Sequence, residues 1–264
     1  MKKWLIWIIA IVVIVIVTLL FRGPLFPWSP VKPGFTKIES SRVAVFINKM
    51  SDKDSIVYEI DNILLQEEEF HDLTYQDDIR IVVLDKESSM KRFLPWFRGS
   101  GYSVSLSMAN VIYIGPSARR SVHGIEPYLK HELSHMLIGQ NASPKKALKI
   151  HRQGWLTEGI AEYYSGHSFY TKDEFLRVCQ ARNTDFTSLL IDNPMTMPIQ
   201  DIRFKYTYYK YFIEFLAESH GMPKLRAYLK KYLNEPERYI DIFDEVYAVD
   251  LDTLLSEFRQ YILS

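Results

Sequence analysis

The sequence predicts an α+β fold: an N-terminal transmembrane helix, then a small mixed sheet with one helix that carries a histidine motif, then a helical C-terminal part. Three observations predict it. An unbroken apolar run covers residues 4–21. Short β-branched or alternating segments lie before residue 115, and helical spacing of apolar residues prevails after it. Strands followed by helices are typical of the α+β class.

Length and composition set the limits of this interpretation. The chain has 264 residues, of which 47% are apolar, and its formal net charge is zero. These values suit one domain of moderate size plus an appendage, or at most two small domains. No basic run is present, so nothing indicates a nucleic-acid partner. The single cysteine, Cys179, lies in an apolar-periodic stretch and is predicted to be a small buried residue rather than a nucleophile.

The apolar run predicts a transmembrane anchor over residues 1–21. Roughly 17–25 apolar residues cross a bilayer as a helix, and the run contains no charge and a single hydroxyl, Thr18. The alternative is a cleaved signal peptide, whose apolar core would be about 7–15 residues long and would end in small residues. Residues 21–26 read F-R-G-P-L-F and offer no such exit. An uncleaved, single-pass anchor in the cell membrane is therefore predicted, with membrane lipid as its partner.

Flanking charges bear on the orientation of this anchor. Lys2 and Lys3 favour a cytoplasmic N-terminus and an extracytoplasmic domain, whereas Arg22 and Lys32 on the other side weaken that bias.

A linker is predicted over residues 22–37, because its prolines recur every third residue and favour extended, polyproline-like chain. These prolines are Pro24, Pro27, Pro30 and Pro33. An irregular packed arm is the alternative. The domain proper is predicted to cover residues 38–264.

Strands and helices follow from the spacing of apolar residues. Strands are predicted over residues 42–47, 80–84, 102–107 and 111–114. Helices are predicted over residues 55–69, 126–137, 156–166, 171–182 and 203–264. Gly139 is the expected stop of the second helix, and Thr171 with Glu174 forms a capping-box pattern. Breaks are expected near Gly221 and Pro236.

A complete H-E-x-x-H motif occupies residues 131–135. His131 and His135, four apart on a helix, lie on one face with side chains roughly 5–6 Å apart. Two imidazoles at that spacing can bind one zinc ion at about 2.0–2.1 Å each. Glu132 is adjacent to the first histidine and could act as general base on a metal-bound water. The alternative is a pair of partly exposed histidines on an ordinary amphipathic helix.

A third ligand is supplied by a later helix. Residues 136–141 lack the glycine and histidine of a metzincin continuation, so that class is excluded. Residues 154–164 read G-W-L-T-E-G-I-A-E-Y-Y. Here the chain resembles the gluzincin metallopeptidases, which include thermolysin and the zinc aminopeptidases, and looks closest to the thermolysin-like peptidase MA families of bacteria. The family's W-L-x-E-G-x-A-x-Y segment matches residues 155–163, with Thr157 where many relatives have asparagine.

The resemblance implies a site with one Zn²⁺ per chain. Its ligands would be His131, His135 and Glu158. Glu162, one turn after Glu158, would orient a ligand histidine, with a solvated surface glutamate as the alternative. Tyr206 opens a stretch that resembles the aminopeptidase helix whose tyrosine stabilises the oxyanion, with Tyr208 as the next candidate.

The predicted function is a zinc-dependent peptidase that hydrolyses peptide bonds through a metal-activated water. An endopeptidase is favoured over an aminopeptidase, because residues 98–119 contain no Asp or Glu to hold an α-ammonium group. Glu126 or Glu162 could reach the site from elsewhere. Peptide or protein substrates are expected to add as a strand along residues 110–114, provided that this strand is the sheet edge.

Two other functions fit the same residues. A catalytically degenerate zinc-binding surface domain could act as a binding or scaffold module, although the intact Glu132 argues against it. The other alternative is a structural surface protein in which the motif is coincidental.

The remaining histidines have no ligand spacing. His71, among acidic residues, is expected at a solvated helix end, and the rest are expected at the surface or behind the ligands. These are His123, His151, His167 and His220.

Overall fold

The structure is a computed structural model that describes residues 2–95, 102–152, 154–182, 184 and 199–263. The chain divides into two compact units, and each is described by itself. One comprises Met1–Leu64 and Asp77–Glu132 and contains the sheet. The other comprises Leu65–Gln76 and Leu133–Ser264 and is helical. The α+β class predicted from the sequence is confirmed.

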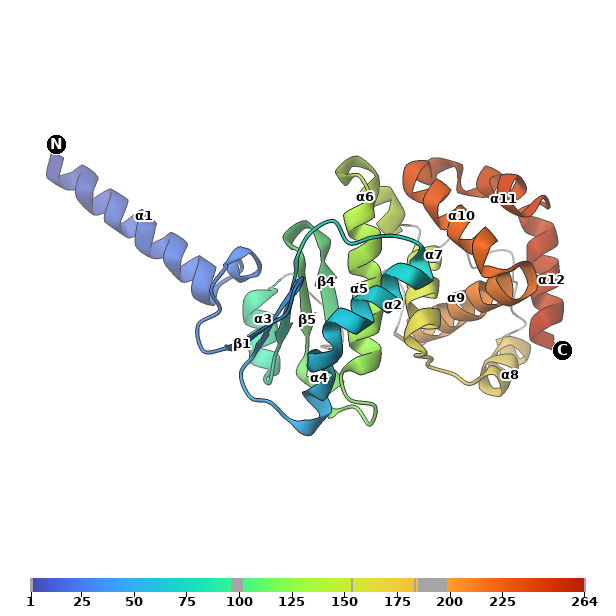
Figure 1. The fold of residues 1–264 in the computed structure, drawn as a ribbon, viewed down its shortest axis with the longest axis horizontal. Helices are drawn as coiled ribbons and strands as arrows, with labels where there is room; N and C mark the ends of the chain where they lie inside the picture. The colour runs from blue at the N-terminus through green and yellow to red at the C-terminus, as the bar shows by residue number, and fades with distance from the viewer. Residues whose placement is uncertain (1, 96–101, 153, 183, 185–198, 264) are drawn as a thin grey trace. The chain divides into compact units, whose positions relative to one another are not determined.

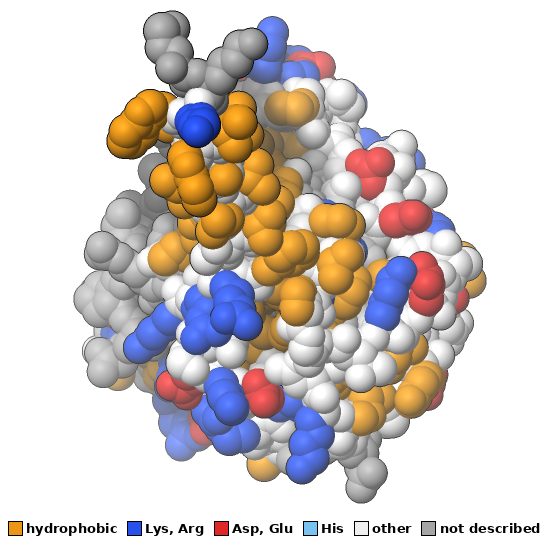
Figure 2. Space-filling view, turned by 90° about the vertical axis from the view of Figure 1, so that its left-hand side faces the viewer, with side chains coloured by type: hydrophobic (Ala, Val, Ile, Leu, Met, Phe, Trp, Pro, Cys, Tyr) orange, Lys and Arg blue, Asp and Glu red, His pale blue; other side chains and the backbone are white. Residues whose placement is uncertain are grey.

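Helix α1, Lys2–Arg22, is the N-terminal apolar helix. By length and composition it could cross a membrane, or it could be a signal sequence, and it is the one such helix among the described residues. Its side chains from Trp4 to Val17 are exposed almost without interruption. Figure 2 views the molecule from the left-hand side of Figure 1, and hydrophobic side chains gather on this face.

The segment after α1 packs as an arm. A 3-10 turn, η1 (Phe26–Trp28), places the Phe26 ring in the core, stacked on Phe93 with centroids 3.8 Å apart. Lys32 Nζ donates to the carbonyl oxygens of Phe26 and Ser29. These contacts agree with the packed-arm alternative rather than with an extended polyproline-like chain. The boundaries 1–21, 22–37 and 38–264 themselves stay a prediction.

Five strands form one mixed sheet in the order β1-β2-β3-β5-β4 (Figure 1). Strands β2, β3 and β5 are parallel, and the outer strands β1 and β4 pair antiparallel with β2 and β5. The three parallel strands are rich in Val and Ile and mostly buried, as expected for strands covered on both faces. The bounds are β1 Thr36–Glu39, β2 Val43–Ile47, β3 Ile79–Val83, β4 Ser103–Leu106 and β5 Val111–Ile114.

Strand β5 is not an edge of the sheet, which corrects one prediction. Strand β5 lies between β3 and β4, with Val111 paired to Leu106 and Ile114 to Ser103. Residues 110–114 therefore cannot accept a peptide as an added strand, because both sides of β5 already carry ladder hydrogen bonds. Because the alternation of side chains cannot tell an inner strand from an edge strand, the order of β4 and β5 could not be predicted.

Of the helices that accompany the sheet, those over 55–69 and 126–137 were predicted, each with one difference, whereas α3 and α4 were not predicted. The predicted helix over 55–69 starts as a 3-10 helix, and only its second part is α-helical. The motif helix α5 runs through Gly139, so the predicted stop there is wrong; Asn141 Nδ2 donates to Leu137 O at 2.8 Å within it. The bounds are η2 Asp52–Glu59, α2 Ile60–His71, α3 Glu87–Phe93, η3 Ser107–Ala109, α4 Pro116–Arg120 and α5 Glu126–Asn141.

The helical unit continues the chain after α5 (Figure 1). Gly221 with φ +90° ends α9, as the sequence predicted, and Thr171 and Glu174 exchange the hydrogen bonds of a capping box before α8. The bounds are α6 Pro144–Arg152, α7 Gly154–Ser165, α8 Lys172–Arg182, α9 Ile199–His220, α10 Met222–Asn234, η5 Pro236–Arg238, α11 Tyr239–Tyr247 and α12 Leu251–Leu263.

An aromatic core holds α7 in this unit. The fully buried Trp155 ring lies within 6 Å of the rings of Phe212, Tyr228 and Phe243. A Cβ atom at Gly159 would come within 2.8 Å of Tyr209 O, so α7 and α9 touch backbone to backbone at this point. Segment 155–159 is therefore fixed against α9 by large rings on one side and by glycine on the other.

Candidate metal centre

Helix α5 presents two histidines toward a single point. Leu133, Met136 and Leu137 on the same helix are fully buried, so their face is anchored in the interior. His131 and His135 are partly exposed and lie one turn apart. This arrangement leaves the imidazoles accessible to an ion while the backbone that carries them stays fixed.

Glu158 on α7 completes the group. His131, His135 and Glu158 each offer one ligand atom, and these atoms all lie within 4.8 Å of one another. His135 Nε2 and Glu158 Oε2 are 3.2 Å apart. In a tetrahedral zinc site with bonds of about 2.0–2.2 Å, neighbouring donors are separated by about 3.3 Å. The two-imidazole, one-carboxylate set and this separation fit zinc with one coordination position left for water or substrate.

Glu132 follows His131 directly and is 6% exposed. It lies on the same helix as both histidines and is not a member of the three-residue group. A base that acts on a metal-bound water must lie beside the ligands without binding the ion itself. Its predicted role as the base is therefore compatible with the geometry.

Glu162 is buried, so the alternative of a solvated surface glutamate is wrong. Its Oε2 lies 2.7 Å from Nδ1 of His167, in the turn after α7. His167 in turn makes an edge contact with Phe169, whose ring lies 6.3 Å from Tyr206. The sequence placed His167 only at the surface or behind the ligands. The orienting role of Glu162 toward a ligand histidine stays a prediction.

Burial separates the candidate tyrosines of α9. Tyr208 and Tyr209 are fully buried and Tyr211 is 5% exposed, whereas Tyr206 is only half-buried. Tyr208 packs on Phe175 and Phe258. A residue that donates to a substrate oxygen needs access, which favours Tyr206 over Tyr208.

A buried polar group lies against helix α5. His71 is 1% exposed, so the predicted solvated helix end is wrong. Its Nδ1 lies 2.9 Å from Glu67 O and 3.3 Å from Glu67 Oε2, and its Nε2 lies 2.7 Å from Ser134 Oγ. Burial, only partly offset by the Glu67 carbonyl, lowers the pKa of His71 to about 4. The neutral ring must donate through Nδ1 to the carbonyl, so Ser134 donates to Nε2.

Ser134 is not a nucleophile despite this partner. Its side chain is fully inaccessible, so no substrate carbonyl can reach Oγ. The lone thiol is also inert: Cys179 is buried as predicted, and burial raises its pKa to about 11. Among the described residues, the grouped His131, His135 and Glu158 are thus the arrangement with evident chemistry.

A helix that carries H-E-x-x-H, a carboxylate supplied by a later helix, and a small mixed sheet in the same chain define a zinc-peptidase-like fold. A family model of the Peptidase MA superfamily matches residues 63–264. The chain belongs to this superfamily, and the gluzincin-like membership expected from its motifs is confirmed.

Solved structures similar to the chain include two M1 zinc metallopeptidases. One is a mutant of a two-domain M1 zinc metallopeptidase bound to L-arginine, with 12% identity, a TM-score of 0.47, and coverage of 86% of this chain and 50% of that one. The other is a mutant M1 zinc metallopeptidase from Deinococcus radiodurans bound to a Tyr-Ser-Ala substrate, with 12% identity, a TM-score of 0.45, and coverage of 84% and 50%. The chain thus spans about half the length of these structures. No curated protein matches the chain.

Proposed function

We propose that the chain is a membrane-anchored, zinc-dependent endopeptidase with one Zn²⁺ per chain. One observation carries the proposal: ligand atoms of His131, His135 and Glu158 lie within 4.8 Å of one another, and Glu132 stands beside the first of them. Membership in the Peptidase MA superfamily supports peptide bonds as the substrate class.

The proposed roles follow from the chemistry of each side chain. Zinc held by these three residues would lower the pKa of a water molecule toward 7 and polarise the scissile carbonyl. The Glu132 carboxylate accepts the proton of that water and later gives it to the leaving amine. The Tyr206 hydroxyl donates to the oxygen on which negative charge develops. The Glu162 carboxylate is held in place by His167 and would lie behind the ligands, where it can orient a ligand histidine.

An endopeptidase is supported by the acid-free stretch before the motif helix, since an aminopeptidase needs a carboxylate to hold the substrate's α-ammonium group. Residues 98–119 contain no Asp or Glu. The two other carboxylates that could reach the site both have cationic or imidazole partners. Glu126 is ion-paired with Lys130 at 2.7 Å, and Glu162 contacts His167. A buried ammonium group without a partner would cost several kcal/mol.

The proposal includes an uncleaved anchor over residues 1–21, a linker over 22–37 and a catalytic domain over 38–264, exposed on the extracytoplasmic side. Support comes from the length and composition of α1 and from Lys2 and Lys3 before it. Mass spectrometry of the mature protein tests the anchor. A start near residues 22–30 would show a cleaved signal peptide.

The decisive experiment uses the full-length chain in detergent micelles. Zinc content and cleavage of peptides with blocked N-termini are measured for the wild type, Glu132→Gln and a matched control, Glu126→Gln. Glu132→Gln is expected to keep zinc and to lose at least about a hundredfold in turnover, because it removes the base and no ligand. Glu126→Gln should cleave normally. Bound zinc without cleavage of any peptide would favour the binding-module alternative, and cleavage only of free N-termini would favour an aminopeptidase.

A further inference from the structure

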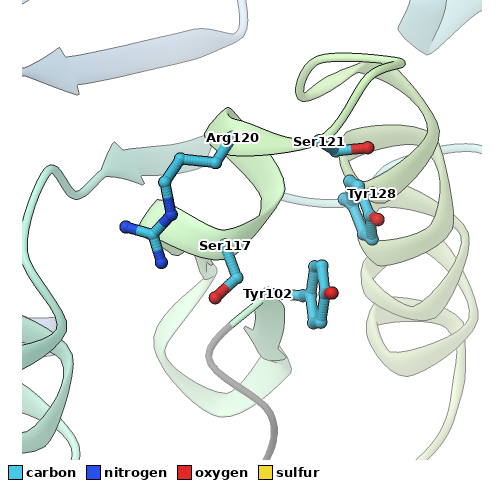
Figure 3. A pocket seen from close by; sticks show the side chains of 5 residues that line it. All are labelled: Tyr102, Ser117, Arg120, Ser121 and Tyr128. Atoms are coloured by element: carbon cyan, nitrogen blue, oxygen red, sulfur yellow. The ribbon is translucent and has the colours of Figure 1, made fainter.

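A pocket of about 270 Å³ lies in the sheet-containing unit, beside the helix that carries the motif. Figure 3 shows the two tyrosine rings together on one side and the Arg120 guanidinium beyond Ser117 on the other. The lining residues come from the start of β4, from α4 and its end, and from the first turns of α5: Tyr102, Ser117, Arg120, Ser121 and Tyr128.

All five lining side chains carry hydrogen-bond donors, and one is cationic. None of the described residues that line the pocket carries a carboxylate. The rings of Tyr102 and Tyr128 stack on each other, with centroids 5.0 Å apart and planes 19° apart, which keeps this wall in place. A donor-rich lining with one guanidinium is complementary to a carboxylate, which offers only acceptors when ionised.

The Arg120 guanidinium is ion-paired with Glu87, but this partner can be exchanged for another carboxylate. Its Nη2 lies 3.0 Å from Glu87 Oε1, and both side chains are more than 60% exposed. Exposed ion pairs of this kind contribute little and are screened by salt. A carboxylate that enters the pocket can therefore share or replace Glu87 as the partner of the guanidinium.

Position on α5 ties the pocket to the candidate metal centre. Tyr128 precedes His131 by three residues and Glu132 by four, so it lies about one helical turn from both, roughly 4.5–6 Å along the axis. Tyr102 directly precedes β4, one of the two edge strands of the sheet. A peptide that lies along the face of α5 carrying Glu132 would therefore also pass Tyr128 and the pocket that it lines.

We infer that this pocket is a specificity subsite for an acidic side chain, Asp or Glu, close to the bond that is cleaved. The inference rests on the proposed peptidase function and names its substrate preference. A peptide's own C-terminal carboxylate has the same chemistry, and the experiment separates the two sources.

The test measures binding, so that it does not depend on turnover. Zinc-loaded, full-length Glu132→Gln is titrated calorimetrically with blocked peptides in which one Glu is moved through the sequence and compared with Gln at the same place. Each is also made with a free C-terminus. The same titrations are repeated with Arg120→Gln added and, as the matched control, with Arg119→Gln, because Arg119 is the neighbouring arginine of α4 and lies outside the pocket lining.

The inference predicts that Glu at one position improves the dissociation constant at least about fivefold over Gln. Arg120→Gln should reduce this ratio to within about twofold, and Arg119→Gln should leave it intact. Arg120→Glu should reverse the preference toward Lys.

A missing Glu preference, an equal loss in both arginine variants, a preference that follows only the free C-terminus, or no peptide binding at all would each overturn the inference. Zinc-dependent cleavage of the same peptides by the wild type would leave the proposed function standing in those cases. An Arg120-dependent preference without wild-type cleavage would instead sink the proposed function and keep the subsite.

Discussion

The imidazole of His71 lies 2.7 Å from the hydroxyl of Ser134, although the two residues are 63 positions apart. Ser134 is the residue before His135, so this contact fixes the backbone of α5 at a candidate metal ligand. The neighbouring contacts act on the same stretch: Tyr75 donates to Leu133 O at 3.0 Å, and Gln76 N donates to Gln140 Oε1 at 2.9 Å. The end of α2 and the turn after it therefore brace the ligand helix.

This contact predicts a pH-dependent stability. Burial lowers the pKa of His71 from 6.5 to about 4. Between these values the unfolded chain binds a proton that the folded chain does not, so stability is complete above pH 6.5 and falls toward pH 4. The slope is up to about 1.4 kcal/mol per pH unit. Urea unfolding of metal-free wild type and His71→Asn at several pH values checks it. Glu67, His135 and Arg226 act on the same ring, so the difference between the two curves is the readout, and parallel curves would refute the prediction.

The metal ligands make a second prediction. His131→Ala, His135→Ala and Glu158→Ala should each abolish stoichiometric zinc, because a set of two donors holds the ion far more weakly than three. His123→Ala, at an exposed histidine, should keep the metal. Elemental analysis after dialysis measures the outcome. Unchanged zinc in Glu158→Ala would remove α7 from the site.

Tyrosine variants test the oxyanion role. Tyr206→Phe should lower kcat about a hundredfold with little change in KM, since a transition-state donor is lost. Tyr208→Phe is expected to keep kcat, because the ring is fully buried among Phe175, Tyr209 and Phe258. Steady-state kinetics on one blocked peptide compares them. Equal losses in both variants would point to packing damage rather than to a donor.

Gly159→Ala should lower stability by about 1–3 kcal/mol and weaken zinc binding at the same time. The added Cβ would lie 2.8 Å from Tyr209 O and 2.7 Å from Ile213 Cγ1. Because Glu158 is the preceding residue, any shift of α7 moves this carboxylate. A second change, Ile213→Val, should not restore either property, since the backbone contact remains. Thermal melts and zinc titration provide the measurements, and an unaffected zinc affinity would show that α7 tolerates the shift.

Phe26→Ala should destabilise the chain by about 3–5 kcal/mol, although residue 26 lies in the predicted linker. Its ring is fully buried and stacked on Phe93. Trp28→Ala, at a side chain that is 48% exposed, is the matched control and should change stability little. Chemical denaturation of the detergent-solubilised chain compares the two. Equal stabilities would mean that the arm is not part of the folded core.

The sequence predicted the parts of the fold that local pattern determines. Strands 42–47, 80–84 and 111–114, the capping box at Thr171 and the break at Gly221 all depend on neighbouring residues, and the structure has them in place. Strand β1 was not predicted because just one of its four residues is even partly buried, so no alternation marks it. The order of β4 and β5 depends on pairing between strands, which side-chain period cannot reveal.

His71 shows what sequence reading missed at the site. Neighbouring acidic residues suggested a solvated end, yet Ile60, Leu64, Glu67 and His71 follow the i, i+4, i+7, i+11 spacing of one helix face. This spacing indicates that Glu67 and His71 continue the buried face of α2, and it could have predicted their burial. The pairing with Ser134 itself depends on two distant segments and has no local sequence mark.

The packed arm also sets how far the proposed peptidase can reach. A flexible linker of a dozen residues would have an end-to-end distance of about 20 Å, and a domain attached to it could move that far from its anchor. Here residues 23–25 alone separate α1 from the buried Phe26, and backbone hydrogen bonds from Gly23 and Leu25 to Leu19 O occupy even these. With α1 in the lipid as proposed, three residues would connect the membrane helix to the sheet-containing unit. With so short a tether, this unit would stay at the bilayer surface instead of sampling the surrounding solution.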